Sequence, residues 1–149
     1  MGADTLTGGL GADRFVYTNI SDSLFTATAP NNAYDRIRDF NFGQGDRIVL
    51  TGLPSSVFNA GLISAANLTA AVTAAYADAD PITAGAQALA TNSAVFFSFG
   101  SSVATRRTYV SVNDGTAGFN AANDLFVEVT AMVGTLPTGS LTASNYFTT

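Results

Sequence analysis

The sequence predicts a mainly β fold with one or two short helices, and three observations support this prediction. Hydrophobic residues make up 47% of the chain and charged residues only 11%. Ser, Thr and Asn must therefore supply most of the polar surface, and these residues favour turns and strands over surface helices. A nine-residue pattern of Gly and Asp opens the chain, and apolar and polar residues alternate in its last third.

The charged residues exclude several classes of function. Six Arg stand against ten Asp and one Glu, for a net charge of −5, so no basic patch is available for nucleic acid. Cys and His are absent, which removes disulfides, thiolate nucleophiles, tetrahedral zinc sites and imidazole bases. No apolar run reaches the roughly 18 residues of a transmembrane helix. We therefore expect no enzyme, no nucleic-acid partner and no transmembrane segment.

The nine-residue unit at positions 8–16 fits the repeat pattern G-G-x-G-x-D-x-U-x, in which U is apolar. The same Asp and apolar places recur nine residues earlier and nine residues later, at Asp4, Leu6, Asp22 and Leu24. Glycine lets the backbone carbonyls of such turns face inward, and a short carboxylate adds further oxygen ligands for a hard cation such as calcium. An ordinary tight turn without a cation is the alternative interpretation.

A parallel β-roll is the structure in which such units stack, with successive units on alternate sides. A complete calcium site then joins units eighteen residues apart, so Asp4 and Asp22 share one side and Asp13 faces the other. The residues that we predict to bind calcium in these turns are Gly2, Asp4, Gly8, Gly9, Gly11, Asp13 and Asp22.

The first fifty residues resemble the C-terminal calcium-binding repeats of repeats-in-toxin (RTX) proteins, which type I secretion systems export. Residues 34–40 and 43–50 are similar to the D-x-I-x-D-F…G-x-D-x-I-x-L block that follows the last repeats in serralysin-type secreted proteases. The resemblance implies RTX repeat turns over residues 1–27 and a β-rich capping and secretion domain over residues 28–149, in one continuous folding unit. Because the chain begins within a repeat, we expect it to be part of a longer protein.

Two further Asp residues follow the repeat on one face of an expected strand. Asp35 and Asp39 flank Ile37 in an alternating pattern. Their carboxylates either bind calcium or pair with Arg36, Arg38 or Arg47, and the family resemblance favours calcium for at least one of them. Residues 43–46 are expected to form a turn, and residues 47–50 the strand after it.

The remaining chain predicts a helix and then an antiparallel β-sandwich-like region. Residues 64–77 carry apolar side chains four apart, with Ser64 as a candidate N-cap. A second short helix is expected at residues 83–90. Strands are expected at 94–99, 108–112 and 125–131. The loop at 113–124 carries Asp114 and Asp124, which form either a calcium site or ordinary turn contacts.

The sequence therefore predicts a non-catalytic, calcium-binding C-terminal module for type I secretion and calcium-triggered folding outside the cell. The alternative is a calcium-dependent structural or adhesive domain, because the distal part is similar to the ends of RTX surface-layer proteins. Both interpretations imply a secreted protein. The expected partners are the secretion machinery, another copy of the chain or the cell surface.

Overall fold

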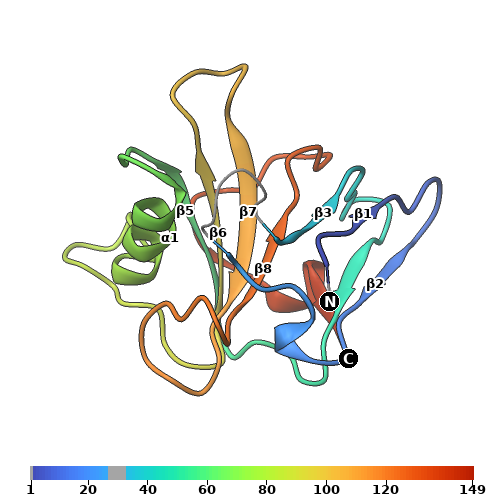
Figure 1. Ribbon diagram of the computed structural model, residues 1–149, viewed down its shortest axis with the longest axis horizontal. Helices are drawn as coiled ribbons and strands as arrows, with labels where there is room; N and C mark the ends of the chain where they lie inside the picture. Colours follow the sequence, from blue (N-terminus) through green and yellow to red (C-terminus); the bar gives the residue numbers. More distant parts are fainter. Residues whose placement is uncertain (1, 27–32) are drawn as a thin grey trace.

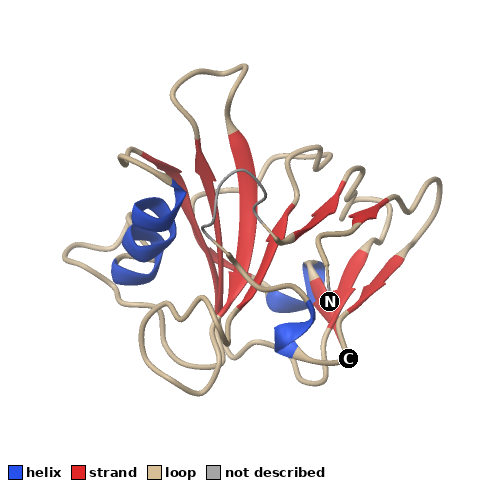
Figure 2. Ribbon diagram, in the orientation of Figure 1, coloured by secondary structure: helices blue, strands red, loops and turns tan. Residues whose placement is uncertain are grey.

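The computed structural model describes residues 2–26 and 33–149. Its regular structure is mostly strand, with one α-helix and two short 3-10 helices among the described residues (Figure 2). The mainly β class is therefore confirmed. The boundary that we expected between residues 27 and 28 lies outside the described residues.

The strands form a seven-stranded sheet and a three-stranded sheet, in the orders β1-β3-β8-β7-β6-β5-β9 and β10-β4-β2. Their bounds are β1 Thr5–Leu6, β2 Arg14–Val16, β3 Asp35–Ile37, β4 Arg47–Val49, β5 Val57–Ile63, β6 Ala94–Phe99, β7 Arg107–Val112, β8 Leu125–Glu128, β9 Gly139–Leu141 and β10 Phe147–Thr148. The helix α1 is Leu68–Ala77, and the 3-10 helices are η1 Ile20–Asp22 and η2 Ala143–Asn145.

The first four strands form two parallel pairs in different sheets. β1 pairs with β3 in the large sheet, and β2 pairs with β4 in the small one. The chain thus alternates between the sheets as it proceeds from β1 to β4, and the four strands lie together at the right of Figure 1. The C-terminal strand β10 is parallel to β4 and continues the small sheet.

The large sheet is mixed rather than antiparallel. β6, β7 and β8 are antiparallel neighbours as expected, but β5 is parallel to β6 and β3 is parallel to β8. The helix α1 lies between β5 and β6 in the chain and connects these two parallel strands, which need a long crossover. Neither the strand β5 nor this crossover was predicted from the sequence.

The helix begins later than predicted. Its N-cap is Asn67, whose side chain accepts a hydrogen bond from Ala70 N at 2.9 Å, and Ser64 lies outside the helix just beyond β5. The predicted second helix at 83–90 is wrong, because Ala79 and Leu89 donate backbone hydrogen bonds that pair this segment with the end of α1. No helix in the described part of the chain is long and apolar enough to cross a membrane.

The core has two parts, one on each face of the large sheet. One face packs against the small sheet, where Phe96, Val110 and Val127 meet Ile48 and Phe147. The other face is covered by α1, through Val72 and Tyr76, and by a group of aromatic rings around Phe126. The large sheet is therefore buried on both sides in its middle.

Replacement of Phe96 by Ala should remove the main contact between the sheets. Phe96 is fully buried and its ring meets those of Tyr146 and Phe147, so we expect a loss of about 3–5 kcal/mol in the free energy of unfolding. Urea unfolding followed by circular dichroism measures it. Val103→Ala, at an exposed position, is the control and should change stability by less than about 0.5 kcal/mol.

Candidate functional site

Each of the first four strands has an Asp at its start. Asp4, Asp13 and Asp46 immediately precede β1, β2 and β4, and Asp35 is the first residue of β3. Within both parallel pairs, the later carboxylate accepts a hydrogen bond from the backbone of the earlier Asp: Asp4 N donates to Asp35 Oδ1, and Asp13 N donates to Asp46 Oδ1, each at 2.9 Å. The same contact is thus repeated in the two sheets.

Asp46 has a structural role that the sequence did not reveal, since its residues 43–46 predicted only a turn. Asp46 is fully buried, and its Oδ2 also accepts a hydrogen bond from Asn41 N at 2.8 Å. The sequence does contain a signal for this role of Asp46, because Asp46-Arg47 repeats Asp13-Arg14. In the structure, Arg14 and Arg47 are paired residues of the neighbouring strands β2 and β4.

Asp39 connects the turn after β3 to the turn at residues 8–11, which we call the glycine turn. Its two carboxylate oxygens accept hydrogen bonds from Gly8 N at 2.9 Å and from Gly9 N at 2.8 Å. Neither Asp35 nor Asp39 forms an ion pair with the arginines that we considered: Arg36 pairs with Glu128, and Arg47 donates to backbone carbonyls. Both carboxylates instead accept hydrogen bonds from backbone N–H groups.

Asp13 differs, because its Oδ2 is buried and accepts no hydrogen bond from any described residue. The carboxylate lies directly against Gly8, where an added Cβ would come within 2.7 Å of Oδ2. Gly9 and Gly11 have φ values of 100° and 109°, which an L side chain rarely adopts. Asp13 thus keeps a buried carboxylate oxygen without a hydrogen-bond donor, next to glycines in the left-handed region, and calcium binding by this residue stays a prediction.

Asp4 and Asp22 both lie near the buried side chain of Tyr17. Burial raises the pKa of Tyr17, and the charges of Asp35, Asp4 and Asp22 raise it further. The Tyr17 hydroxyl makes no hydrogen bond of normal geometry to a described residue. That Asp4 and Asp22 share one calcium site stays a prediction.

Burial also raises the pKa of Asp35, against the lowering effect of the Asp4 backbone N–H. Asp22 has a local contact as well, because its Oδ2 caps η1 by accepting from Asn19 N at 2.8 Å. Gly2 is exposed and lines a small hollow together with Asp22 and Leu24.

Asp114 and Asp124 hold the loop between β7 and β8. Asp124 is fully buried, and its two oxygens accept from Asp114 N at 2.9 Å and Asn120 N at 2.6 Å. Burial raises the pKa of Asp124, although these N–H groups act in the opposite direction. Asp114 Oδ1 accepts from Thr116 N. These contacts are those of turn chemistry, and a calcium site here stays a prediction.

Metal-ligating side chains do not gather into a group of three or more anywhere within residues 2–26 and 33–149. Backbone carbonyls would thus have to supply most oxygens of a calcium site, as the glycine turns allow.

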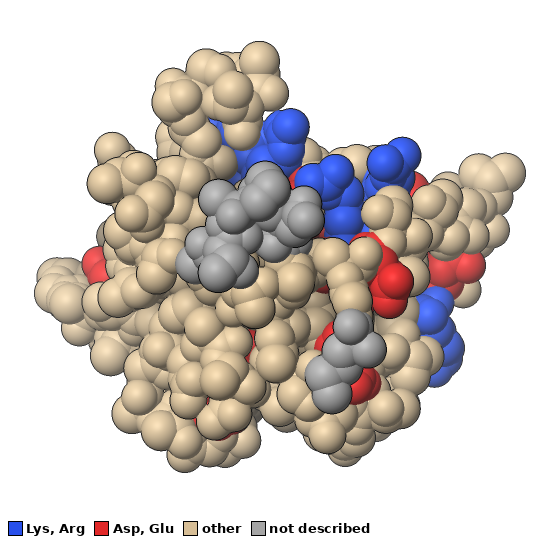
Figure 3. All heavy atoms as spheres, viewed as in Figure 1, with Lys and Arg blue, Asp and Glu red and all other residues tan. Residues whose placement is uncertain are grey.

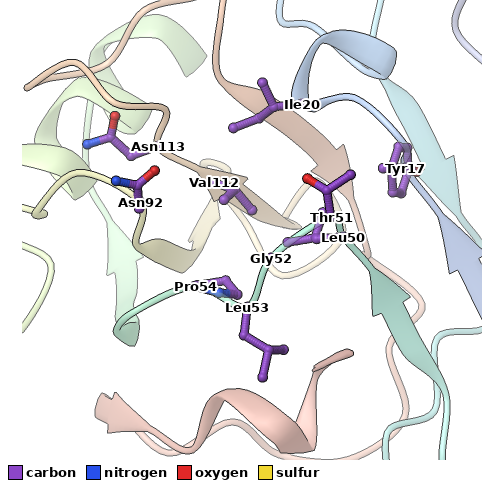
Figure 4. A pocket seen from close by; sticks show the side chains of 10 residues that line it. All are labelled: Tyr17, Ile20, Leu50, Thr51, Gly52, Leu53, Pro54, Asn92, Val112 and Asn113. Atoms are coloured by element: carbon purple, nitrogen blue, oxygen red, sulfur yellow. The ribbon is translucent and has the colours of Figure 1, made fainter. Parts of the chain in front are cut away.

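A separate pocket of about 310 Å³ lies where the two sheets meet (Figure 4). Asn92 and Asn113 stand at one end of it and Tyr17 at the other, with Leu53 and Pro54 between them. None of its lining residues is charged, and sequence analysis did not identify it.

The comparisons with known proteins are negative: no family model, no curated protein and no solved structure matches this chain. Any function proposed for this chain must therefore rest on its own sequence and geometry.

Replacement of Asp46 by Ala should destabilise the protein strongly. It leaves the N–H groups of Asp13 and Asn41 without their carboxylate acceptor, and we expect a loss of roughly 3–5 kcal/mol in the free energy of unfolding. Asp78→Ala is the control, because Asp78 Oδ1 accepts one longer hydrogen bond, from Gln87 N at 3.2 Å. Equal losses of unfolding free energy in the two variants would show that the hydrogen bonds of Asp46 do not stabilise the two turns.

The raised pKa of Asp35 predicts a pH dependence in calcium-free buffer. The folded protein favours the neutral carboxyl, so the contribution of Asp35 to stability is full below its unfolded pKa of 3.8 and is lost as pH rises through the higher folded pKa. Asn cannot titrate, and its Oδ1 can still accept from Asp4 N. The stability of Asp35→Asn relative to the natural protein should therefore increase as pH is raised from 3 to 7, as measured by urea unfolding in chelator. A difference in stability between the two proteins that stays constant over this pH range would contradict this prediction.

Proposed function

We propose that this chain is a non-catalytic calcium-binding module of an RTX protein, and that its first four strands are two turns of a parallel β-roll. The single observation that carries the proposal is the buried Asp13 Oδ2, which has no donor in a turn of three glycines. Leaving such an oxygen without a partner costs about 1–3 kcal/mol, and a calcium ion would supply that partner.

The other predicted ligands support the site to different degrees. Asp4 is exposed, and its carboxylate accepts no hydrogen bond from a described residue, so it is free to bind a cation. Asp35 and Asp39 already accept backbone N–H groups but keep lone pairs for a metal. Asp13, before β2, and Asp4, before β1, are therefore our first candidates for carboxylate ligands, each in its own turn.

Calcium would act on folding through charge. Three carboxylates, those of Asp4, Asp22 and Asp35, lie near the buried Tyr17 in a chain of net charge −5, and they repel one another without a cation. Each occupied site adds roughly 1.4 kcal/mol of stability when calcium is tenfold above its Kd. At the low calcium concentration of the cytosol the unfolded state, which suits type I export, would thus be favoured. At the higher calcium concentration outside the cell the folded state would be favoured.

A calcium titration of the isolated chain tests this proposal, with far-UV circular dichroism and heat followed together. We expect a cooperative gain of β-structure with calcium at or below millimolar levels, and no gain with magnesium. Asp13→Asn should weaken calcium binding at least about tenfold, since it removes a charged ligand. Asp78→Asn, which alters a carboxylate at the end of α1, should leave calcium binding unchanged.

Two outcomes would count against the proposal. A chain that is fully folded in chelator and releases no heat with calcium would show that the glycine turns are only turns. Equal calcium affinity in the Asp13 and Asp78 variants would place the site elsewhere.

The alternative function is a calcium-dependent structural or adhesive domain, and one observation favours it. β1 and β2 are edge strands of the two described sheets; Leu10, in the connection between them, is 95% exposed, and Val16, at the end of β2, is 58% exposed. Exposed strand edges with apolar side chains promote association between chains. Oligomers that form with calcium and protein concentration, measured by sedimentation, would favour this alternative.

A further inference from the structure

Another hollow, of about 330 Å³, lies between the large sheet and the segment that joins β8 to β9. Strands β5, β6 and β7 contribute one side of this groove, and residues 130–138 contribute the other. None of the residues that we propose to bind calcium lines it. Its polar lining residues include Asn59, Ser98, Arg106, Thr108, Thr130 and Thr138.

The backbone around this groove is held in place by Asn59. Its side chain is mostly buried, donates to the carbonyls of Leu136 at 3.1 Å and Pro137 at 3.2 Å, and accepts from Gly61 N at 3.0 Å. The register of β5 against β6 shifts between Asn59 and Leu62, and Gly61 has a φ of 73° there. Such bulges commonly redirect a strand beside a binding site.

Hydroxyl groups run across the groove from one strand to the next. Ser98 Oγ and Thr108 Oγ1 lie 3.1 Å apart and share a hydrogen bond, and Thr130 Oγ1 accepts from Thr108 N at 3.2 Å. The side chains of Thr135 and Thr138 are exposed and form no hydrogen bond with a described residue. The groove thus offers several hydroxyl donors and acceptors to a ligand.

Arg106 is the one charged residue among the residues that line the groove. Its guanidinium is exposed and pairs with no described carboxylate, whereas the neighbouring Arg107 shares Glu128 with Arg36. The Arg106 backbone is fixed, because its N–H donates to Ser102 O at 2.9 Å in the hairpin between β6 and β7. Basic side chains gather on the upper part of the face shown in Figure 3, although the protein as a whole is acidic.

We propose that this groove binds a small carboxylate-bearing, hydroxyl-rich molecule, which is the chemistry of an acidic sugar. A single guanidinium matches the two oxygens of one carboxylate, and the hydroxyl groups of Ser98, Thr130 and Thr138 match the hydroxyl groups of a sugar. This binding site is additional to the proposed calcium turns and does not depend on them.

The test is a titration of isotope-labelled protein with glucuronic acid, followed by amide chemical shifts, with glucose as the neutral control. It is run in saturating calcium, so that the chain is folded whether or not calcium is required for folding. We expect glucuronic acid to shift the amides of residues that line the groove, and glucose to shift them much less. Binding should weaken as salt is added, because an exposed ion pair is screened.

Two variants and one control locate the site. Arg106→Gln should weaken glucuronic acid binding by at least about tenfold, because hydrogen bonds to a charged group are lost. Thr138→Val should weaken it by a smaller factor. Arg14→Gln removes an equal charge from the exposed start of β2 and should leave the affinity unchanged.

The proposal fails if glucuronic acid shifts no groove amide, or if Arg106→Gln binds as tightly as the natural protein. It also fails if glucose binds equally well or if the shifts map to the turn around Asp13, which would indicate chelation of calcium by the sugar acid. Because calcium binding is measured separately with Asp13→Asn, a failure here leaves the calcium result standing, and the reverse is also true.

Discussion

The hydrogen bond from a backbone N–H to a buried carboxylate of the next turn is the contact on which the N-terminal third depends. Strands β1 to β4 contain only two or three residues each, and parallel pairs of this length are weak alone. Asp35 and Asp46 add to each pair one equivalent hydrogen bond from a backbone N–H to a carboxyl oxygen. The strands of each pair form too few backbone hydrogen bonds to fix their register alone. The hydrogen bonds to the Asp side chains therefore help to fix it.

These contacts also orient the apolar residues that build the core. Two residues after Asp13, Asp35 and Asp46 the chain places Phe15, Ile37 and Ile48, all of which are buried in the core between the two sheets. The C-terminal strand enters the same core through Phe147 and pairs with β4. A cation that tightens the turns would thus stabilise the packing of the last strand as well, because both parts share one core.

Local patterns made part of this structure predictable. The nine-residue spacing located Asp4 and Asp13, and the strand expected at residues 94–99 matches β6 in both bounds. The parallel crossover from β5 to β6 was missed because the sequence of β5 contains Asn59 and Gly61, which break the alternation at the bulge. The groove beside Arg106 joins residues from 59 to 138, and no local pattern connects positions so far apart in the chain.

The acidic residues divide into two groups that the sequence alone cannot separate. Asp39, Asp46 and Asp124 use both carboxylate oxygens to accept backbone N–H groups, so their first role is to hold loops. Asp4 and Asp13 follow the same Gly-Asp pattern, yet their carboxylates accept no hydrogen bond from the described chain. The Asp13 Oδ2 atom is buried, and a buried carboxylate oxygen without a donor is costly for folding, whereas water can solvate the exposed Asp4. The uneven use of these carboxylates therefore favours a protein whose stability depends on its ionic surroundings.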